Sequence, residues 1–405
     1  MNAPVITGLG TVSPNGLGTR AYWEATLRGD SGIGPITRFE PDGYPGRTGG
    51  EVKDFDPKER LPSRLLPQTD HMTRLALVAA EEALSDAGIG PGDLPDFAMG
   101  VVTAASAGGM EFGQREMEAL WSKGGAYVSS YQAFAWFYPV NTGQISIRHG
   151  LRGASSAVVT EQAGGLDAVA KARRHIRQGT PQMLAGGVDS ALCPWGWLCM
   201  SRSGRVSTVE DPARAYVPFD VEASGYVPGE GGALMVLEDA AAAARRGAGK
   251  PYGAVAGYAA TFDPRPGGDQ EPGLRRAIET ALAEARITAA DVDVVYADAC
   301  GVPELDRLEA EALAGVFGPR GVPVTAPKTM TGRLLAGGAS LDLATALLSL
   351  RDQVVPPTVN IGRPAHGELV DLVVGEPREA RLTNALVLAR GYGGFNSAMV
   401  VRRGA

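Results

Sequence analysis

The sequence predicts an α/β protein made of two units, on three observations. Short apolar runs alternate with longer amphipathic stretches, which is the pattern of strands and helices that pack on one another. The chain has 405 residues, more than one simple core usually holds. Its 44% hydrophobic and 20% charged residues are ordinary for a folded protein, and its 55 glycines do not form a low-complexity run.

The individual elements follow from local patterns along the chain. Short runs of buried-type residues predict strands over residues 5–9, 98–103, 183–186, 233–237, 292–297, 383–389 and 398–401. Longer stretches with a helical apolar period predict helices over residues 72–87, 274–285 and 305–316.

A weak internal similarity relates the two units. The opening VITGLG at residues 5–10 is similar to AVAGY at residues 254–258. The polar stretch 240–251 is the expected seam between the units. We therefore expect a first unit over residues 1–250 and a second over residues 251–405, packed together rather than joined by a flexible linker.

Composition and charge exclude several classes of function. Three cysteines, an odd number, argue against a disulfide framework and for a reducing compartment. The N-terminus has no basic leader, and no apolar run approaches the ~18 residues of a membrane span. With a net charge of −7 and no basic stripe, nucleic acid is not an expected partner. We expect a soluble cytoplasmic protein with neither a membrane nor a nucleic-acid partner.

The most informative local feature is the segment SAVVTEQAGGLDAV at residues 156–169. It predicts a β-branched strand, a tight turn and a helix of small residues. Such an arrangement presents a reactive side chain from the turn, where the helix N-terminus polarises it. Gln162 occupies that position. Its amide is not a nucleophile, so covalent acyl transfer is not expected here.

This segment resembles the active-site elbow of β-ketoacyl-acyl-carrier-protein synthases, in which a cysteine stands at the position of Gln162. Further passages carry the same resemblance, at residues 219–232, 297–309, 328–333 and 391–398. The first is similar to the family's brace of the active site. The next two are similar to its first histidine motif and its lysine-plus-second-histidine motif. The last is similar to its glycine-rich C-terminal loop.

The departures from the family concern catalysis. The resemblance puts Asp298 and Arg333 at the two catalytic histidine positions, while Lys328 and the acidic Asp306 and Glu309 remain. A synthase needs neutral imidazoles that donate hydrogen bonds to a thioester carbonyl and to the enolate of malonyl decarboxylation. Asp298 would repel that enolate, and Arg333 is always charged. Because the family fold brings these positions together, we expect an Asp298–Arg333 ion pair in the former catalytic cavity.

This pattern of loss resembles one branch, the chain-length factor or ketosynthase β subunit of bacterial type II aromatic polyketide synthases. Residues 134–138, 159–165 and 302–306 carry it, and the similarity covers nearly the whole chain. It implies a thiolase fold, a duplicated five-layer αβαβα sandwich. It also implies a cysteine-bearing ketosynthase α partner and an acyl carrier protein that brings malonyl units on its phosphopantetheine. No cofactor or metal of the chain's own is expected.

Two functions remain open on the sequence. In the first, the chain is a non-catalytic subunit of the ketosynthase heterodimer that completes the partner's tunnel and sets product length. Aromatic residues 134–138 would then lie at or near the subunit interface. In the second, it is a decarboxylase that makes an acetyl primer from malonyl-carrier protein through Gln162. The loss of both donors, at roughly 3 kcal/mol of transition-state stabilisation each, weighs against the second.

Residues 109–121 predict a helix with an unusual face. Met110, Gly113 and Met117 share this face, and a glycine inside a helix costs about 1 kcal/mol relative to alanine. The resemblance implies that these three residues and Phe134 line the end of the polyketide tunnel, where bulky side chains stop elongation. Flexible methionines and a glycine then favour a deep tunnel and a long product. The alternative is a core helix whose glycine accommodates a neighbour.

The remaining candidates are interpreted as structural. Cys300 is expected to be a small buried hydrophobe, and Cys193 and Cys199 lack the spacing of metal ligands. The basic run 171–177 is expected to complement a helix C-terminus, with docking of an acidic carrier protein as the alternative. The histidines lie outside the motifs, at His71, His149, His175 and His366.

Overall fold

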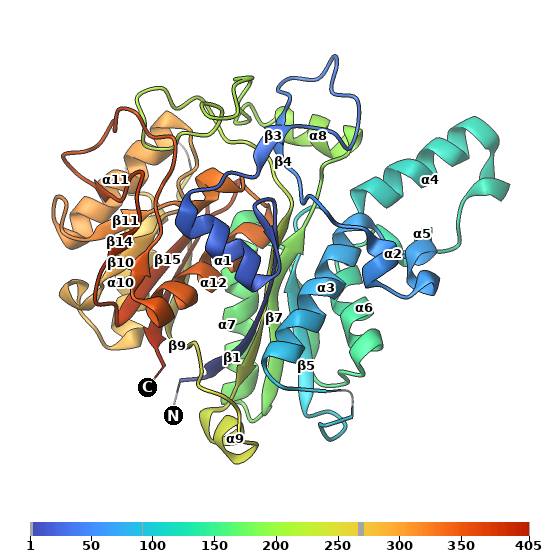
Figure 1. The fold of residues 1–405 in the computed structure, drawn as a ribbon, viewed down its shortest axis with the longest axis horizontal. Helices are drawn as coiled ribbons and strands as arrows, with labels where there is room; N and C mark the ends of the chain where they lie inside the picture. The colour runs from blue at the N-terminus through green and yellow to red at the C-terminus, as the bar shows by residue number, and fades with distance from the viewer. Residues whose placement is uncertain (1–2, 91, 266–270, 405) are drawn as a thin grey trace.

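The computed structural model describes residues 3–90, 92–265 and 271–404, and twelve strands of this part form one mixed sheet (Figure 1). In spatial order they are β13 (Asp371–Leu372), β11 (Pro323–Thr325), β10 (Val294–Tyr296), β15 (Asn384–Arg390), β16 (Phe395–Arg403), β9 (Gly253–Phe262), β1 (Val5–Ser13), β8 (Gly231–Glu238), β7 (Gln182–Asp189), β5 (Met99–Ala104) and β6 (Ser155–Val158), with β2 (Gly16–Leu17) paired to β1. Two small ribbons pair β3 (Ile33–Pro35) with β4 (Thr48–Gly50) and β12 (Val354–Val355) with β14 (Arg378–Glu379).

The sheet consists of two halves with the same topology, which identifies a duplication. In the order β1-β8-β7-β5-β6, the first two pairings are antiparallel and the last two are parallel. The order β9-β16-β15-β10-β11 repeats this pattern. The halves meet where Val5 and Ile6 of β1 pair with Ala254 and Gly253 of β9. The sequence similarity of residues 5–10 and 254–258 therefore falls on the equivalent first strands.

Helices complete five layers around these half-sheets (Figure 1). The central layer holds α7 and α12, and α12 contacts β7 and β8 of one half and β15 and β16 of the other. The outer faces are covered by α3 on the first half and α10 on the second. The helices are α1 (Thr19–Arg28), α2 (Pro57–Arg60), α3 (His71–Asp86), α4 (Met110–Lys123), α5 (Gln132–Ala135), α6 (Val140–His149), α7 (Gly164–Arg177), α8 (Pro194–Ser201), α9 (Ala240–Arg245), α10 (Gly273–Ala285), α11 (Pro303–Phe317) and α12 (Ala336–Asp352).

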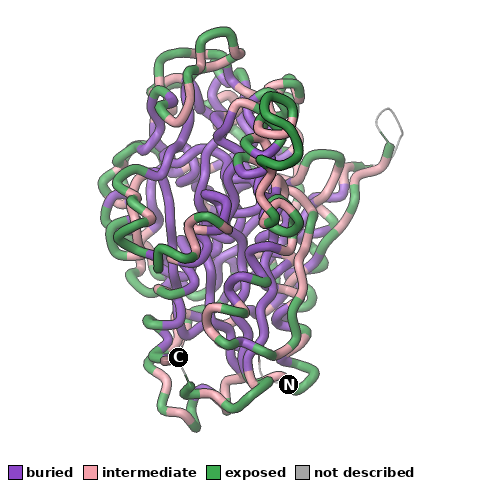
Figure 2. The backbone as a smooth tube through the Cα atoms, turned by 90° about the vertical axis from the view of Figure 1, so that its right-hand side faces the viewer, coloured by how far each residue is buried: buried purple, intermediate pink, exposed green. Residues whose placement is uncertain are grey.

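The inner helix α12 is buried because its residues are apolar or small on almost every side. Residues 336–350 of α12 are all buried, and a helix that is hydrophobic all round belongs in a core. Figure 2 shows the same burial along the strands, with exposure confined to the outer loops and helices. The αβαβα arrangement expected from the sequence is confirmed. The division at residue 250 stays a prediction.

Residues 110–135, which we call the arm, leave this layered body. Figure 1 shows α4 extending away from the sheet before the chain returns to α5. Trp121 near its tip is 80% exposed and Tyr127 is 65% exposed. Among the described residues, no helix combines the length and apolar character needed to cross a membrane.

Candidate functional site

The turn that carries Gln162 joins β6 to α7. A 3₁₀ turn, η3 (Glu161–Ala163), leads directly into α7, so the predicted elbow is confirmed. Glu161 has a φ of 52°, a left-handed conformation that is strained for a residue with a side chain. Thr160 Oγ1 donates to Asp167 Oδ2 at 2.5 Å across the turn. Gln162 is only 6% exposed, so the elbow holds a buried amide where a nucleophile would need access.

Close packing of α7 on α12 fixes the surroundings of Gln162. A Cβ at Gly165 would lie 2.5 Å from Ser340 Oγ and 2.6 Å from Ser340 N, so only glycine fits this contact. Gly338, in the first turn of α12, faces the amide: a Cβ there would lie 3.1 Å from Gln162 Oε1. Gln162 is therefore packed against the start of α12.

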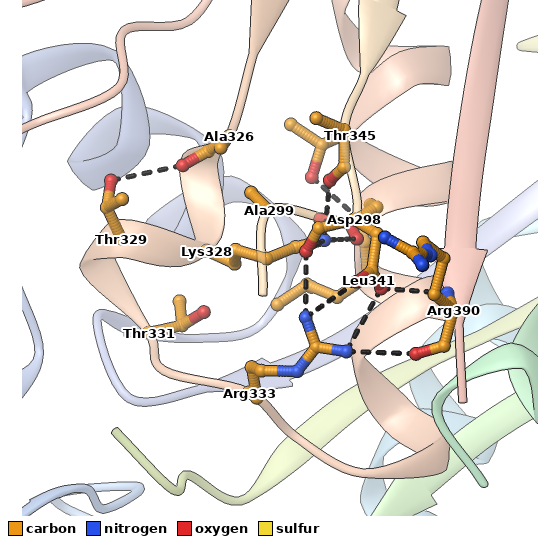
Figure 3. Close-up of polar contacts among 12 residues, drawn as sticks. Asp298, Ala299, Ala326, Lys328, Thr329, Thr331, Arg333, Leu341, Thr345 and Arg390 are labelled. Carbon is orange, nitrogen blue, oxygen red and sulfur yellow. Dashed lines mark hydrogen bonds and ion pairs between the residues drawn. The ribbon is translucent and has the colours of Figure 1, made fainter. Parts of the chain in front are cut away.

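Asp298 and Arg333 form a buried ion pair with two hydrogen bonds (Figure 3). Asp298 follows β10, and Arg333 follows the 3₁₀ turn η5 (Pro327–Met330). Arg333 Nη1 donates to Asp298 Oδ2 and Nη2 donates to Oδ1, both at 3.0 Å. Nη1 also donates to the Asp298 carbonyl at 2.8 Å, and Nη2 to the Arg390 carbonyl at 3.1 Å. The pair expected from the sequence is confirmed.

Both members of this pair are charged in spite of their burial. Burial disfavours the Asp298 carboxylate, but the charges of Arg333 and Lys328 and the hydrogen bonds from Arg333 overcome it and hold the pKa of Asp298 below its usual range. Burial also disfavours the Arg333 cation, but Asp298 raises the pKa of Arg333 well above its ordinary value. Neither side chain supplies the neutral hydrogen-bond donor that a synthase needs.

Lys328 braces the strand end that carries Asp298. Its Nζ donates to the Ala297 carbonyl at 2.7 Å and the Asp298 carbonyl at 3.0 Å (Figure 3). It also lies 2.8 Å from Oδ2 of Asp342 on α12. Burial raises the pKa of Asp342, and the Lys328 charge opposes that shift. The retained lysine is therefore engaged with its own scaffold.

The retained acids of α11 hold the backbone of the same loop. Glu309 accepts the N–H groups of Asp298 at 2.7 Å and Ala299 at 2.9 Å. Asp306 accepts the N–H of Gly301 at 2.9 Å, and burial raises the pKa of Asp306 to about 7. Ala299 has a φ of 48°, so these carboxylates support a strained turn. Asp306 and Glu309 therefore have a structural role that does not depend on a histidine at position 298.

The space left beside the ion pair is too small for a substrate. Its cavity measures about 70 Å³ and is bordered by Gln162, Asp298, Arg333 and the glycine loop 391–394. Small-molecule sites usually measure about 300–1,000 Å³, and one water takes about 30 Å³ in the liquid. The cavity has room for a few waters and excludes an acyl thioester.

Tyr392 covers the mouth of this cavity. Its N–H donates to Glu161 Oε2 at 2.7 Å, and the Arg205 guanidinium lies 4.7 Å from the centre of its ring. Burial raises the pKa of Glu161, and the charge of Arg333 opposes that shift. The glycine loop is thus tied to the elbow itself.

No cysteine in the described residues has the setting of a nucleophile. Cys300 borders the small cavity, is 5% exposed, and its pKa is raised by burial to about 11. It is the buried hydrophobe expected from the sequence. Burial also raises the pKa of Cys193 to about 11, and Cys199 lies on the surface. Within the described ranges, no three His, Cys, Asp or Glu side chains gather as a metal site.

His149, at the end of α6, should make stability depend on pH. Burial, aided by the charge of Arg148, lowers its pKa from 6.5 to about 4, so the folded chain stays unprotonated where the unfolded chain binds a proton. The unfolding free energy should therefore fall as the pH drops from 6.5 towards 4, by about 1–2 kcal/mol. Guanidinium unfolding of wild type and His149→Gln at pH 7.5 and 5 tests this. Equal losses in the two proteins would contradict it.

The residues expected at the tunnel end lie on the arm. Met110 begins α4 and is partly buried, and Gly113 is buried. Met117 is 41% exposed and Phe134, in α5, is 38% exposed. In the isolated chain Met117 and Phe134 therefore lie on the surface rather than in an enclosed cavity. Their role in a tunnel stays a prediction that requires a partner.

Gly113 does not open onto empty space. A Cβ at this position would lie 3.5 Å from Trp195 Cζ3 and 3.6 Å from Trp136 Cβ, which are ordinary contact distances. The Trp195 N–H also donates to Gln114 Oε1 at 2.9 Å, so α8 is joined to α4 here. The sequence interpretation, in which Gly113 deepens the tunnel, is incomplete because Trp136 and Trp195 lie directly beside the glycine.

The basic run 171–177 ends α7 as expected, with Arg174, His175 and Arg177 in the last turn of the helix. Arg173 is 4% exposed and Nη1 donates to both oxygens of Glu284 at 3.0 and 2.9 Å. Arg177 Nη1 donates to the same carboxylate at 3.1 Å. These arginines tie α7 to α10 across the second half-sheet. Arg173 is unavailable to a carrier protein, so the docking alternative is wrong for this residue.

Sequence reasoning missed three residues that complete the site. The Arg390 N–H donates to Asp298 Oδ1 at 2.8 Å, and its carbonyl accepts from Arg333. Asp342 neutralises Lys328, and Arg205 stacks on Tyr392. Arg390 directly precedes the glycine loop, which was the one available signal. The others are far from any motif along the chain.

Comparison with known proteins identifies the family. The protein-family model described as "Beta-ketoacyl synthase, N-terminal domain" matches residues 2–243, and the family model described as "Beta-ketoacyl synthase, C-terminal domain" matches residues 252–362. The chain belongs to the β-ketoacyl synthase family. It is similar to the tetracenomycin polyketide synthase ketoacyl synthase beta subunit of Streptomyces glaucescens, with 63% identity over 100% of both chains. It is also 58% identical, over 98% of both, to the actinorhodin polyketide putative beta-ketoacyl synthase 2 of Streptomyces coelicolor.

Solved structures agree with this placement. The ishigamide ketosynthase/chain length factor has a TM-score of 0.91 and 25% identity over 100% of both chains. A type II polyketide synthase acyl carrier protein in complex with its ketosynthase bound to the hexaketide has a TM-score of 0.87 and 27% identity over 99% of both chains. The expected thiolase fold and the resemblance to ketosynthase β subunits are confirmed.

Proposed function

We propose that this chain is the non-catalytic, chain-length-determining subunit of a type II polyketide ketosynthase heterodimer. The observation that carries the proposal is the Asp298–Arg333 ion pair beside Gln162. The chain keeps the complete scaffold of a synthase, yet charged and amide side chains fill the three positions of its chemistry. A chain that keeps the synthase scaffold but not the catalytic side chains fits a subunit that shapes its partner's active site. Relatives that are named as beta subunits support this function.

The proposed partner is a ketosynthase α subunit with a catalytic cysteine. Exposed aromatic side chains on the segment just after the arm and on α8 support an interface, since large exposed apolar patches are rare on monomers. Trp136 is 46%, Phe137 48% and Trp195 47% exposed. In addition β6 is an edge of the sheet, and edge strands are usually covered or paired. One partner that covers both features would leave the arm at the inter-subunit boundary.

The substrates arrive on a second protein in this proposal. An acyl carrier protein brings malonyl units and holds the growing poly-β-ketone on its phosphopantetheine, so the chain needs no cofactor of its own. A cavity of about 70 Å³ supports this assignment because it leaves no room for a separate reaction at Gln162. We also place the protein in the cytoplasm, on the basis of three cysteines without a disulfide among them.

Reconstitution with malonyl-carrier protein tests the function. Products are measured by mass spectrometry for this chain alone, the α subunit alone, and the co-expressed pair. We expect polyketide from the pair only and no acetyl-carrier protein from this chain alone. Acetyl-carrier protein from this chain alone, abolished by Gln162→Ala, would instead make it a decarboxylase and overturn the proposal.

Gly113→Phe should shorten the product of the pair. A phenyl ring at this position has to displace Trp136 or Trp195 and move bulk towards the surface shared with the partner. Gly113→Ala is the matched control, because its methyl group meets both tryptophans at ordinary contact distances. Mass spectrometry of the products should show shorter chains for Gly113→Phe alone. Unchanged length with an intact heterodimer would contradict the role of this position.

A further inference from the structure

The arm is fixed to the body mainly at the first turn of α4. The principal neighbours of α4 are the 3₁₀ turn η2 (Gly125–Tyr127) and α5, which belong to the arm itself, and α8, and none of these is a strand of the central sheet. Beyond the middle of α4, Met117 and Trp121 are exposed. The direction of the helix is therefore set near its base, where α8 packs on Gly113 and Gln114 and where polar contacts gather near Met110.

One of these contacts comes from Asp70, the residue before α3. Its Oδ1 accepts the Met72 N–H at 2.8 Å and caps α3, while Oδ2 accepts the Phe112 N–H at 2.7 Å in the first turn of α4. The carboxylate is 3% exposed. Asp70 thus joins the start of a core helix to the start of the projecting helix.

A second contact comes from Arg38, in the loop after β3. Its Nη2 donates to Oε2 of Glu111, in the first turn of α4, and Nε donates to the Leu192 carbonyl at 3.3 Å. The backbone of Arg38 is held in turn, because its N–H donates to Glu51 Oε1 at 2.9 Å. The guanidinium is therefore a fixed point to which the base of α4 is attached.

The fixed end of this attachment is Glu230, at the start of β8. It is completely buried, and Oε2 lies 3.2 Å from His71 Nε2 and 3.8 Å from Arg38 Nε. Ser190 Oγ donates to the same oxygen at 2.7 Å, and the Val52 N–H donates to Oε1 at 3.0 Å. Glu230 thus holds the Arg38 guanidinium in a fixed position relative to the sheet.

We propose that this polar clamp, made of Arg38, Asp70, His71, Glu111 and Glu230, sets the direction of the arm and thereby the length of the product. Arg38 is the key positioning residue, because it alone joins the carboxylate of α4 to the buried carboxylate of the sheet. The product-length part of this inference rests on the proposed function. The coupling of Arg38 to the arm does not.

Helix geometry shows why a contact at the base matters at the tip. Met117 lies seven residues after Met110, about 10 Å along the axis at 1.5 Å per residue. A change of about 10° at the base would therefore displace Met117 by about 2 Å, more than the length of a C–C bond. Such a displacement would change the volume of the proposed tunnel end between the arm and the partner, although every side chain that lines the tunnel end stays the same.

Paired variants of the heterodimer test the clamp. Glu111→Gln and Arg38→Gln each remove the ion pair, and the double variant Arg38→Gln/Glu111→Gln tests the coupling of the two residues. Arg38→Lys keeps the positive charge but lacks the planar guanidinium that makes several hydrogen bonds. Arg47→Gln is the matched control, since it lies on the same segment and pairs only with exposed Asp42 and Glu210. The readouts are product-length distribution, total turnover, and amide hydrogen exchange along α4 and α3.

We expect both single variants to raise the minor chain lengths about threefold, the size of effect that a loss of roughly 0.7 kcal/mol in an ion pair produces. The double variant should resemble the singles, Arg38→Lys should lie between them and wild type, and Arg47→Gln should match wild type. Exchange should rise along α4 and not along α3.

Two outcomes overturn the inference, and they are separable from failure of the proposed function. An unchanged length distribution together with unchanged exchange along α4 would show that the clamp does not direct the arm. Faster exchange along α4 with an unchanged distribution would remove its role in product length. If the α subunit alone makes the same products as the wild-type pair, the proposed function fails. The exchange measurement along α4 would still test whether the clamp directs the arm.

Discussion

Arg333→Met should lower the free energy of unfolding by about 3–5 kcal/mol. The variant keeps the length and apolar stem of the side chain, but it leaves the Asp298 carboxylate 2% exposed and without its main counter-charge. It also removes donors from the carbonyls of Asp298 and Arg390. Unfolding in guanidinium, followed at equal protein concentration, should show a lower midpoint with an unchanged slope.

Two further variants show whether the buried charge is the cause. Asp298→Asn/Arg333→Met removes both charges and still offers an acceptor to the Arg390 N–H, so it should recover much of the lost stability. Arg307→Met breaks pairs with exposed Glu304 and Glu311 and should change the midpoint far less. A double variant less stable than Arg333→Met would show that packing, rather than an unpaired charge, dominates.

The outer and inner layers were unequally predictable from the sequence. The helices α3, α10 and α11 have one apolar face, and their predicted bounds lie within two residues of the observed ones. Several strands were predicted too short, since residues 5–9 were expected where β1 spans Val5–Ser13, and no strand was predicted at β9 or β11. The central helix α12 was not predicted. Its residues 336–350 are buried on all sides, so it has no polar face and no period for a pattern to detect. Burial between two half-sheets removes the very signal that identifies surface helices.

The site was predictable where it lies in motifs. The resemblance brought together Gln162, Asp298 and Arg333, and charge complementarity alone then suggested the ion pair. The resemblance did not suggest the backbone groups of Arg390 or the acid Asp342, because a main-chain N–H has no sequence signature. Arg390 lies directly before the glycine loop and Asp342 lies on α12, so these contacts depend on how separate segments pack in the fold.

The arm shows the opposite problem. Its apolar face has the period of a core helix, which is why the sequence allowed that interpretation. The structure leaves Met117 and Trp121 exposed instead. A pattern of apolar residues indicates that a face is covered, but it does not distinguish a cover from the same chain from one supplied by a partner.

Gln162→Cys should not convert this chain into a synthase. The variant restores a thiol at the start of α7, where the helix N-terminus favours a thiolate. However, the oxyanion and the enolate still lack both imidazole donors, each worth about 10²–10³ in rate, so together they account for about 10⁴–10⁶. Mass spectrometry of this variant with malonyl- and acetyl-carrier protein, without the α subunit, should detect no condensation product. The wild-type heterodimer serves as the positive control in the same assay.

The reason lies as much in space as in missing donors. Arg333 and Asp298 bond to each other, to two main-chain carbonyls and to the Arg390 N–H, so neither can turn towards a thioester without leaving a buried charge unpaired. The remaining cavity of about 70 Å³ does not admit the substrate to the new thiol. Even acylation of Cys at position 162 should therefore be slow. Condensation at a rate comparable to that of the wild-type heterodimer would show that the ion pair opens readily, and it would return this chain to the class of enzymes.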